Sequence, residues 1–316
     1  MKKQSHLSVL DIMPIIILAL MVLIFGISTK GLLFSGSNMT NVFNQTLSTL
    51  ICALGMVFVA TMGGTDITVG SLCAMASVFG TLVSDRLGLW SFIPAVIVTG
   101  LLSGFLLGFL NAKCKVNSFM ASLALLIAYR AVVNLNLKSA SFIFPGQYSF
   151  FRSFSFEVIA VIILLAVVVF VFHYTPFGLY VRGIGENENA MSYAGVKVTK
   201  VKIIAFMISG LMAAISSLFL SARVGGVNNT FGTGFEMKVM MAMFIGGIPV
   251  QGGMGSKIYK IVIGAFTITI LENGLNLSNV DGSVTQLVRG IVLLLAIWLT
   301  MFISDKFRYG IRSNAS

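Results

Sequence analysis

Long uninterrupted apolar blocks constrain this chain more than any other feature of its sequence. Ile15–Phe25, Val158–Phe172 and Ile291–Ile303 contain no charged residue. Blocks of this kind, extended to about 20 residues, fit a hydrocarbon core about 30 Å thick at the rise of an α-helix. Because that core holds no water to satisfy backbone polar groups, each block is predicted to be a helix. The short alternating segments of a membrane β-barrel are absent from the sequence.

Composition agrees with this interpretation. Hydrophobic residues make up 57% of the 316 residues and charged residues only 10%, whereas a soluble domain carries about a quarter charged residues. The sequence therefore predicts an all-α polytopic membrane protein, with one transmembrane domain over residues 1–316. About ten spans are expected, at roughly 11–29, 46–62, 70–84, 91–112, 117–134, 157–173, 201–221, 237–248, 258–274 and 284–303. The third and eighth are short, which is typical of broken or re-entrant helices.

The net charge of +11 is explained by the position of the basic residues along these spans. With the N-terminus inside, the outer loops carry Lys30, Arg86, Lys138, Arg152 and Arg223, and Arg130, Lys238 and Arg289 fall within spans. This excess of inner positive charge is typical of cytoplasmic loops, so both termini are predicted to be cytoplasmic and no nucleic-acid surface is needed. The inner loops and ends carry Lys2, Lys3, Lys113, Lys115, Arg182, Lys197, Lys200, Lys202, Lys257, Lys260, Lys306, Arg308 and Arg312.

The sequence contains none of the motifs that would indicate an enzyme. No HExxH, CxxC, phosphate-binding G-x-x-x-x-G-K-[ST] or GxSxG pattern occurs. His6 and His173 flank spans without matching partners, and the three cysteines are expected to be small buried side chains. We therefore expect no catalytic residue, no metal site and no cofactor in this chain, and no ATP hydrolysis by it.

A first glycine-rich segment, 63–71, lies between two apolar blocks. It contains Gly64, Asp66, Gly70 and Ser71. Glycines at this density break a helix or let helices approach closely, and a carboxylate there needs a helix N-terminus, a polar partner or water. Two interpretations remain open: Asp66 caps the following helix, or it contacts a substrate.

A second glycine-rich segment, 246–256, contains Pro249 and the five glycines Gly246, Gly247, Gly252, Gly253 and Gly255. Proline lacks a backbone donor and glycine permits left-handed turns, so a tight turn at the cytoplasmic edge of the membrane is predicted. The simpler interpretation is a plain hairpin between two helices.

The longest inner loop, 174–200, is the only extended polar stretch predicted to face the cytoplasm. Asn187 or Asn189 is expected to cap a short helix that runs through Ala190 and stops at Gly195. Such a short helix is marginal alone in water and needs a docking partner. A solvated loop on the lipid headgroups is the alternative.

At these three segments the sequence resembles the ribose-type permeases of bacterial ATP-binding-cassette sugar importers, in the branched-chain amino acid/ribose permease superfamily. The resemblance runs from about residue 35 to 303. It rests on four stretches in order: Gly64-Thr-Asp-Ile-Thr-Val-Gly-Ser71, the inner loop from Gly185 to Val198, the glycine turn 246–255, and Asn273–Leu277. The turn departs from the family pattern, with Ile248-Pro249 in place of Thr-Ser.

The resemblance implies a role for each stretch. The inner loop would couple the membrane domain to an ATP-binding subunit, through Gly185, Glu186, Asn187, Ala190, Gly195, Val196, Val198 and Lys202. The residues that break helices or lie near the pathway would be Gly64, Asp66, Gly70, Ser71, Gly246, Gly247, Gly252, Gly253, Asn273 and Asn276.

The resemblance also implies partners, location and fold. The partners would be the ATP-binding subunit, which carries ATP and magnesium, an extracytoplasmic sugar-binding protein, and a second permease subunit, identical or different. The protein would lie in the bacterial inner (cytoplasmic) membrane. Its fold would be like that of the vitamin B12 importers.

The expected function is passage of a monosaccharide, a ribose-like pentose or a hexose, with Asp66, Asn273 and Asn276 near the pathway. Import of a nucleoside or furanosyl signal molecule by the same machinery is one alternative, and an ATP-independent secondary transporter is another. An ion pair between Glu272 and Arg289, on adjacent spans, is also expected.

Overall fold

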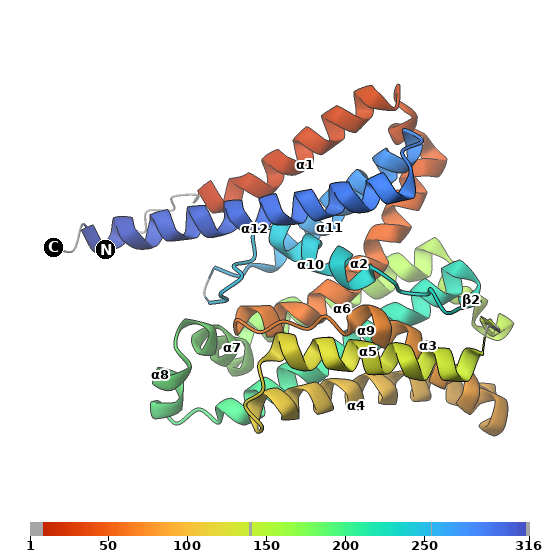
Figure 1. Ribbon diagram of the computed structural model, residues 1–316, viewed down its shortest axis with the longest axis horizontal. Helices are drawn as coiled ribbons and strands as arrows, with labels where there is room; N and C mark the ends of the chain where they lie inside the picture. Colours follow the sequence, from red (N-terminus) through yellow and green to blue (C-terminus); the bar gives the residue numbers. More distant parts are fainter. Residues whose placement is uncertain (1–8, 139–140, 254, 314–316) are drawn as a thin grey trace. The chain divides into compact units, whose positions relative to one another are not determined.

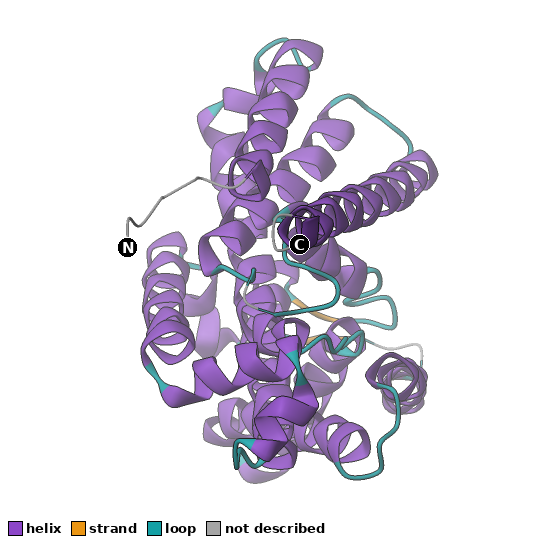
Figure 2. Cartoon of the chain, turned by 90° about the vertical axis from the view of Figure 1, so that its left-hand side faces the viewer, coloured by secondary structure: helices purple, strands orange, loops and turns teal. Residues whose placement is uncertain are grey.

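The computed structural model describes residues 9–138, 141–253 and 255–313, which are almost entirely helical (Figures 1 and 2). Lys2, Lys3 and His6 lie outside the described residues, as do the side chains of Lys306, Arg308 and Arg312. The helices are α1 (Val9–Ser28), α2 (Gly36–Thr61), α3 (Val69–Leu87), α4 (Phe92–Ala112), α5 (Ser118–Leu137), α6 (Phe154–Tyr174), α7 (Pro176–Glu186), α8 (Glu188–Tyr193), α9 (Val198–Val224), α10 (Phe235–Ile245), α11 (Ile258–Leu277) and α12 (Gly282–Ser313).

Each of the ten predicted spans falls on a helix, and the ends differ at a few places. The third helix is longer than expected, because α3 continues through the charged pair Asp85-Arg86 at its exposed end. The eighth, α10, has only 11 residues, as predicted. Among the described residues, six helical segments are long and apolar enough to cross a membrane: α2, Leu89–Ala112, α5, α6, α9 and α11. The chain is therefore an all-α, multi-pass membrane protein.

The helices belong to two compact units. The first unit contains Met1–Thr46, Met240–Val250 and Gly255–Ser316, and the second contains Leu47–Val239 and Gln251–Met254. Each unit is described by itself below.

A ladder of glycines on α4 holds the second unit together. Gly100, Gly104 and Gly108 follow one another at intervals of four residues and all face α9. A Cβ at Gly100 would lie 2.5 Å from the carbonyl oxygen of Gly210, and one at Gly104 would lie 2.7 Å from the Cα of Met207. Small residues at this spacing let two membrane helices pack backbone against backbone. The sequence analysis did not identify this interface.

In the first unit, α1 packs against α11 and α11 contacts α12. Gly274 of α11 lies directly against the ring of Phe25 on α1, which leaves no room for a side chain at that position. The expected ion pair is confirmed: Nε of Arg289 lies 3.0 Å from Oε1 of Glu272. It joins the apolar helices α11 and α12 through opposite charges.

The inner stretch 174–200 differs from the loop that the sequence suggests, because it begins with the 11-residue helix α7. The missed signal is Pro176, whose fixed φ suits the first helical turn, followed by the buried residues Gly178, Val181 and Ile184 at intervals of three. Of the cysteines, Cys52 and Cys73 are buried as expected. The expectation is wrong for Cys114, which is exposed because it follows the end of α4.

The described residues also form one small antiparallel sheet, which the sequence did not predict. Strands β1 (Phe142–Ile143) and β2 (Gly226–Val227) pair with Phe142 opposite Val227. This pairing joins the segments that follow α5 and α9, both in the second unit.

Candidate functional site

The predicted helix break in the second unit is present between α2 and α3. The N–H of Gly63 donates to the carbonyl of Ala60 (2.9 Å) and the N–H of Gly64 to that of Val59 (3.0 Å). With Gly63 at φ +75°, this is the glycine-terminated helix end known as a Schellman motif. The chain therefore leaves the helix at residues 62–68 because Gly63 adopts a left-handed conformation that other residues disfavour.

The side chain of Asp66 stabilises this helix break through hydrogen bonds. Its side chain is fully buried. Oδ1 accepts hydrogen bonds from the backbone N–H (3.0 Å) and the hydroxyl (2.6 Å) of Thr68. Oδ2 accepts from the hydroxyl of Ser209 on α9 (2.7 Å). Of the two interpretations from the sequence, the geometry favours the structural one, with the bond made to Thr68, one residue before α3 begins.

The first turn of α3 is completed by the other two predicted residues of this segment. The hydroxyl of Ser71 donates to the carbonyl of Thr68 (2.8 Å) and is buried. Gly70 has no space for a side chain, because a Cβ there would overlap the carboxylate of Glu236 and lie 2.5 Å from the carbonyl oxygen of Gly232. The start of α3 therefore packs directly against the segment that precedes α10.

Helix α8 is capped at both ends by the residues that the sequence indicated. Of the two candidate caps, Asn187 is the one used: its side chain accepts from the N–H of Ala190 (3.0 Å). At the other end Gly195, at φ +82°, donates to Ser192, and Val196 donates to Met191. This is a second Schellman motif, and it turns the chain into α9, which begins at Val198.

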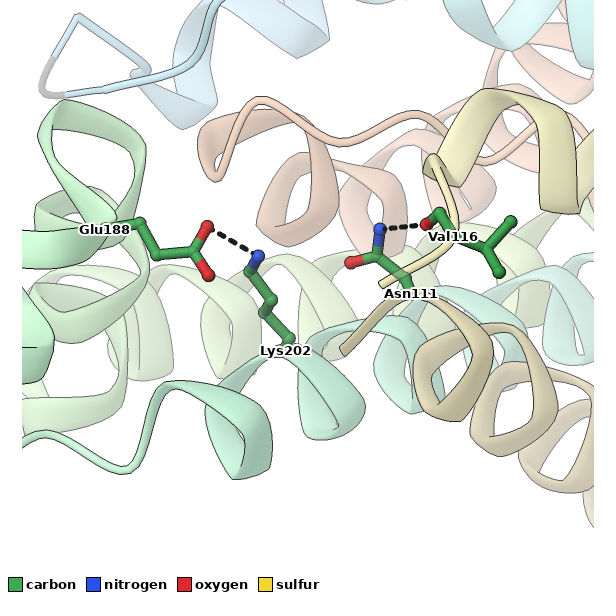
Figure 3. A network of polar contacts seen from close by, with 4 residues as sticks. All are labelled: Asn111, Val116, Glu188 and Lys202. Atoms are coloured by element: carbon green, nitrogen blue, oxygen red, sulfur yellow. Dashed lines mark hydrogen bonds and ion pairs between the residues drawn. The ribbon is translucent and has the colours of Figure 1, made fainter. Parts of the chain in front are cut away.

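Two side-chain contacts hold α8 in position. Lys202 of α9 forms an ion pair of 2.6 Å with Glu188 in the first turn of α8 (Figure 3). On the side of α7, the side chain of Met191 packs against Gly183. Figure 3 also shows Asn111 closing the inner turn between α4 and α5 through its bond to the carbonyl of Val116 (3.0 Å).

Four predicted residues from separate parts of the chain meet at the end of α2. The N–H of Gly253 donates to the carbonyl of Thr61 (2.8 Å). A Cβ at Gly185 or at Gly252 would overlap that same carbonyl oxygen, and one at Gly253 would overlap the carboxylate of Glu186. We call Thr61, Gly185, Glu186, Gly252 and Gly253 the glycine junction. In the glycine junction, the end of α7, which directly precedes α8, contacts both the helix break and the second glycine-rich segment.

The remaining glycines of that segment lie in the first unit and end α10. Gly247, at φ +80°, donates to the carbonyl of Phe244, and Ile248 donates to that of Met243. A Cβ at Gly246 would overlap the carbonyl oxygen of Lys260 on α11. The tight turn that the sequence predicted is thus confirmed, and its glycines are required by geometry.

The two asparagines predicted near the pathway differ from each other. Asn273 is buried and exchanges two amide hydrogen bonds of 2.9 Å with Asn38. Asn276, one turn further along α11, is exposed. Both belong to the first unit, whereas Asp66 belongs to the second.

The reciprocal amide pair leads to a stability prediction. Asn273→Leu leaves the Asn38 amide buried with lost partners, which costs about 1–3 kcal/mol. The double variant Asn38→Leu/Asn273→Leu is expected to recover part of that loss, since neither amide then stays unpaired. Thermal unfolding of the purified protein in detergent measures both. The direct pair would be contradicted if the double variant were no more stable than Asn273→Leu, or if its loss of stability were the sum of the losses in the two single variants.

Sequence reasoning missed one further polar cluster. Arg130, near the middle of α5, was placed within a span and given no role. Its Nη1 donates to the carbonyl of Phe231 at 2.5 Å. Glu236, in the first turn of α10, lies against Gly70 and interacts electrostatically with Arg130. Ionisable residues inside a membrane span are the signal that could have identified it.

Comparison with known proteins adds the following findings. Residues 38–297 match the family described as branched-chain amino acid transport system / permease component. The chain is 32% identical to the ribose import permease protein of Escherichia coli strain K12, over 89% of this chain and 91% of that protein. It is 30% identical to the ribose import permease protein of Haemophilus influenzae, over 86% and 88%. It is 29% identical to the fructose import permease protein of Rhizobium meliloti, over 92% and 85%. No solved structure gives a significant match.

Proposed function

The chain belongs to the branched-chain amino acid transport system / permease component family, and from this premise we propose that it carries a monosaccharide across the membrane as one subunit of an ATP-driven importer. It is a transport component and not an enzyme. Relatives at about 30% identity over most of their length are named as import permeases for ribose, xylose and fructose. We propose a pentose or hexose of this kind as the substrate.

The observation that carries the proposal is that α8 is held firmly in place while most of its side chains stay exposed. Both ends of this six-residue helix are capped, and Met191 and Glu188 fix it to α7 and α9. Its other side chains are exposed, and Tyr193 is 92% exposed. A short rigid helix with an exposed aromatic side chain is a good docking element, because a tyrosine buries a large area in an interface at low entropic cost. The partner would be the ATP-binding subunit, which holds ATP and magnesium.

The other partners follow from the same function. An extracytoplasmic sugar-binding protein would deliver the substrate, and a second permease subunit would complete the passage. The inner position of α8 is supported by the excess of lysine and arginine on the same side of the predicted spans. We place the protein in the bacterial cytoplasmic membrane.

We also propose that the ten helices that coincide with the predicted spans form one permease domain, with a fold like that of the vitamin B12 importers. The agreement between predicted spans and helices α1–α6 and α9–α12 supports this. Asp66 would hold the helix break beside the passage rather than touch the sugar, since its oxygens are occupied within the protein.

Ala190→Glu tests the docking role of α8. Ala190 is exposed within the helix, so the added carboxylate has room and α8 is expected to stay folded. We expect normal insertion into the membrane, with loss of ATP-driven uptake and of the stimulation of ATP hydrolysis in proteoliposomes. Unchanged uptake would contradict the proposed docking.

The control is Thr199→Glu, which places the same charge on an exposed residue at the start of α9. It is expected to leave uptake intact. Gly195 is a poorer target, since any side chain there strains the positive φ that ends α8. A loss of uptake in a Gly195 variant would therefore mix damage to the helix end with damage to docking.

A further inference from the structure

The starts of two helices face one another in the second unit. The segment from Phe231 to Glu236 lies against the first turn of α3, where Gly70 and Gly232 are in backbone contact. Helix α10 is only 11 residues long, about half the length that spans a membrane. Short helices that begin beside a helix break are the elements from which membrane transporters build substrate sites.

Two opposite charges meet at this place. The carboxylate of Glu236 fills the space that a side chain at Gly70 would occupy, next to the positive end of the α3 dipole. Arg130 reaches the same segment from α5, with Nη1 on the carbonyl of Phe231. The two charges influence each other electrostatically, so each lowers the cost of holding the other inside the membrane.

Hydrogen-bonding capacity remains at both groups. Oε1 of Glu236 accepts from the N–H of Gly234 (3.2 Å). No donor among the described residues reaches Oε2, which is buried. The guanidinium of Arg130 carries five N–H donors, of which one is used at Phe231. Both residues remain partly exposed. The cluster therefore holds one buried acceptor that the described residues leave unbonded and several unused donors.

Exposed apolar and amide side chains also occur on the two helices that carry this pair. Ile127, one turn before Arg130 on α5, is exposed, as is Met237, next to Glu236 on α10. Asn134, one turn after Arg130, is exposed as well. A sugar ring presents hydroxyl groups at its edge and C–H groups on its faces, so both polar and apolar side chains suit a sugar passage.

We propose that Glu236 and Arg130 contact the hydroxyl groups of the sugar during its passage and set which sugar passes. The inference rests on the proposed function, because it assumes that this chain lines the passage. The carboxylate accepts from a hydroxyl, the guanidinium donates to one, and Gly70 makes room for the carboxylate. Hydrogen bonds to charged groups depend strongly on where the hydroxyls lie, which gives the pair its selectivity.

The test measures selectivity in the assembled importer. Wild type, Glu236→Gln and Arg130→Lys are reconstituted in proteoliposomes with the partner subunits, and ATP-driven uptake of radiolabelled ribose, xylose and fructose is measured. Glu236→Gln keeps the size of the side chain and removes its charge. We expect uptake of the preferred sugar to fall about ten-fold and the ratios between sugars to change. Arg130→Lys keeps the charge but loses the planar fork and is expected to change the ratios as well.

Glu157→Gln is the matched control. Glu157 is a buried carboxylate of the same unit, bonded by Ser48 (3.2 Å) and lying outside the cluster. This variant should leave the ratios of uptake between the three sugars unchanged. Equal loss for all three sugars in both cluster variants would overturn the inference while leaving the proposed function standing. Absence of ATP-driven sugar uptake in the wild-type complex would overturn the proposed function and the inference with it.

Discussion

Gly185→Ala is expected to abolish ATP-driven uptake, because a single methyl group at this position collides with backbone. The new Cβ would overlap the Thr61 carbonyl oxygen and lie 2.6 Å from the nitrogen of Gly253. Neither atom can rotate away as a side chain can. The last turn of α7 must therefore move, and overpacking of this kind costs about 1–3 kcal/mol.

The functional consequence follows from the position of Gly185 in the chain. It lies three residues before Glu188, the first residue of α8. Moving the end of α7 displaces α8 relative to the helix break at Gly63 and to Gly253. If α8 transmits the motion of the ATP-binding subunit, the glycine junction is the place where that motion reaches the membrane helices.

Gly183→Ala makes a close control for this experiment. It changes the same helix two residues earlier, but its Cβ would meet the side chain of Met191, with the sulfur at 2.5 Å. Methionine is flexible and can repack, so the effect should be much smaller. Uptake in proteoliposomes and thermal unfolding in detergent are measured for both variants. Similar results for the two glycines would refute a specific role for the glycine junction.

Asp66→Ala is expected to lower the free energy of unfolding by about 3 kcal/mol, since it leaves buried donors without an acceptor. Three hydrogen bonds end on this carboxylate, from the N–H and hydroxyl of Thr68 and from the hydroxyl of Ser209. The hydroxyls can turn to other acceptors, but the N–H of Thr68 cannot. The break between α2 and α3 would lose its connection to α9.

Asp66→Asn provides the comparison that separates shape from hydrogen bonding. The amide oxygen can still accept from Thr68, and the amide nitrogen can donate to the hydroxyl of Ser209, so the loss of stability should be smaller than for alanine. Asp85→Ala, at the exposed end of α3, should have little effect. Thermal unfolding of the detergent-purified protein ranks the three. An alanine variant as stable as the wild type would show that Asp66 is not structural.

Much of the candidate site was predictable because its signals are local. A helix cap needs an acceptor side chain and, at the other end, a glycine a few residues later, so Gly195 and the two candidate caps Asn187 and Asn189 were visible in the sequence. The glycines at 246–253 indicated a turn for the same reason. The helix α7 was missed because the stretch 174–200 was treated as one polar loop, although Pro176 at the first helical turn and its buried residues at intervals of three indicate a helix.

The contacts between distant segments were not predictable in the same way. Gly185 and Gly253 each showed a local reason to be glycine, yet their shared neighbour is the carbonyl of Thr61. Glu236 and Arg130 lie far apart in the sequence, and no local pattern connects them. Only the packing of α3, α5 and the start of α10 brings them to one place.

By itself, the sequence determined that this is a helical membrane protein and, to within a few residues, where most of its long helices lie. These properties depend on the free energy of moving each segment from water into lipid, which is a sum over neighbouring residues. Only the tertiary structure decided what the polar residues do: that Asp66 stabilises a helix break, that Asn273 pairs with Asn38, and that Glu236 holds a buried oxygen with no donor among the described residues. A buried polar group takes its role from the partner it meets, and in this chain most of those partners lie far away in sequence.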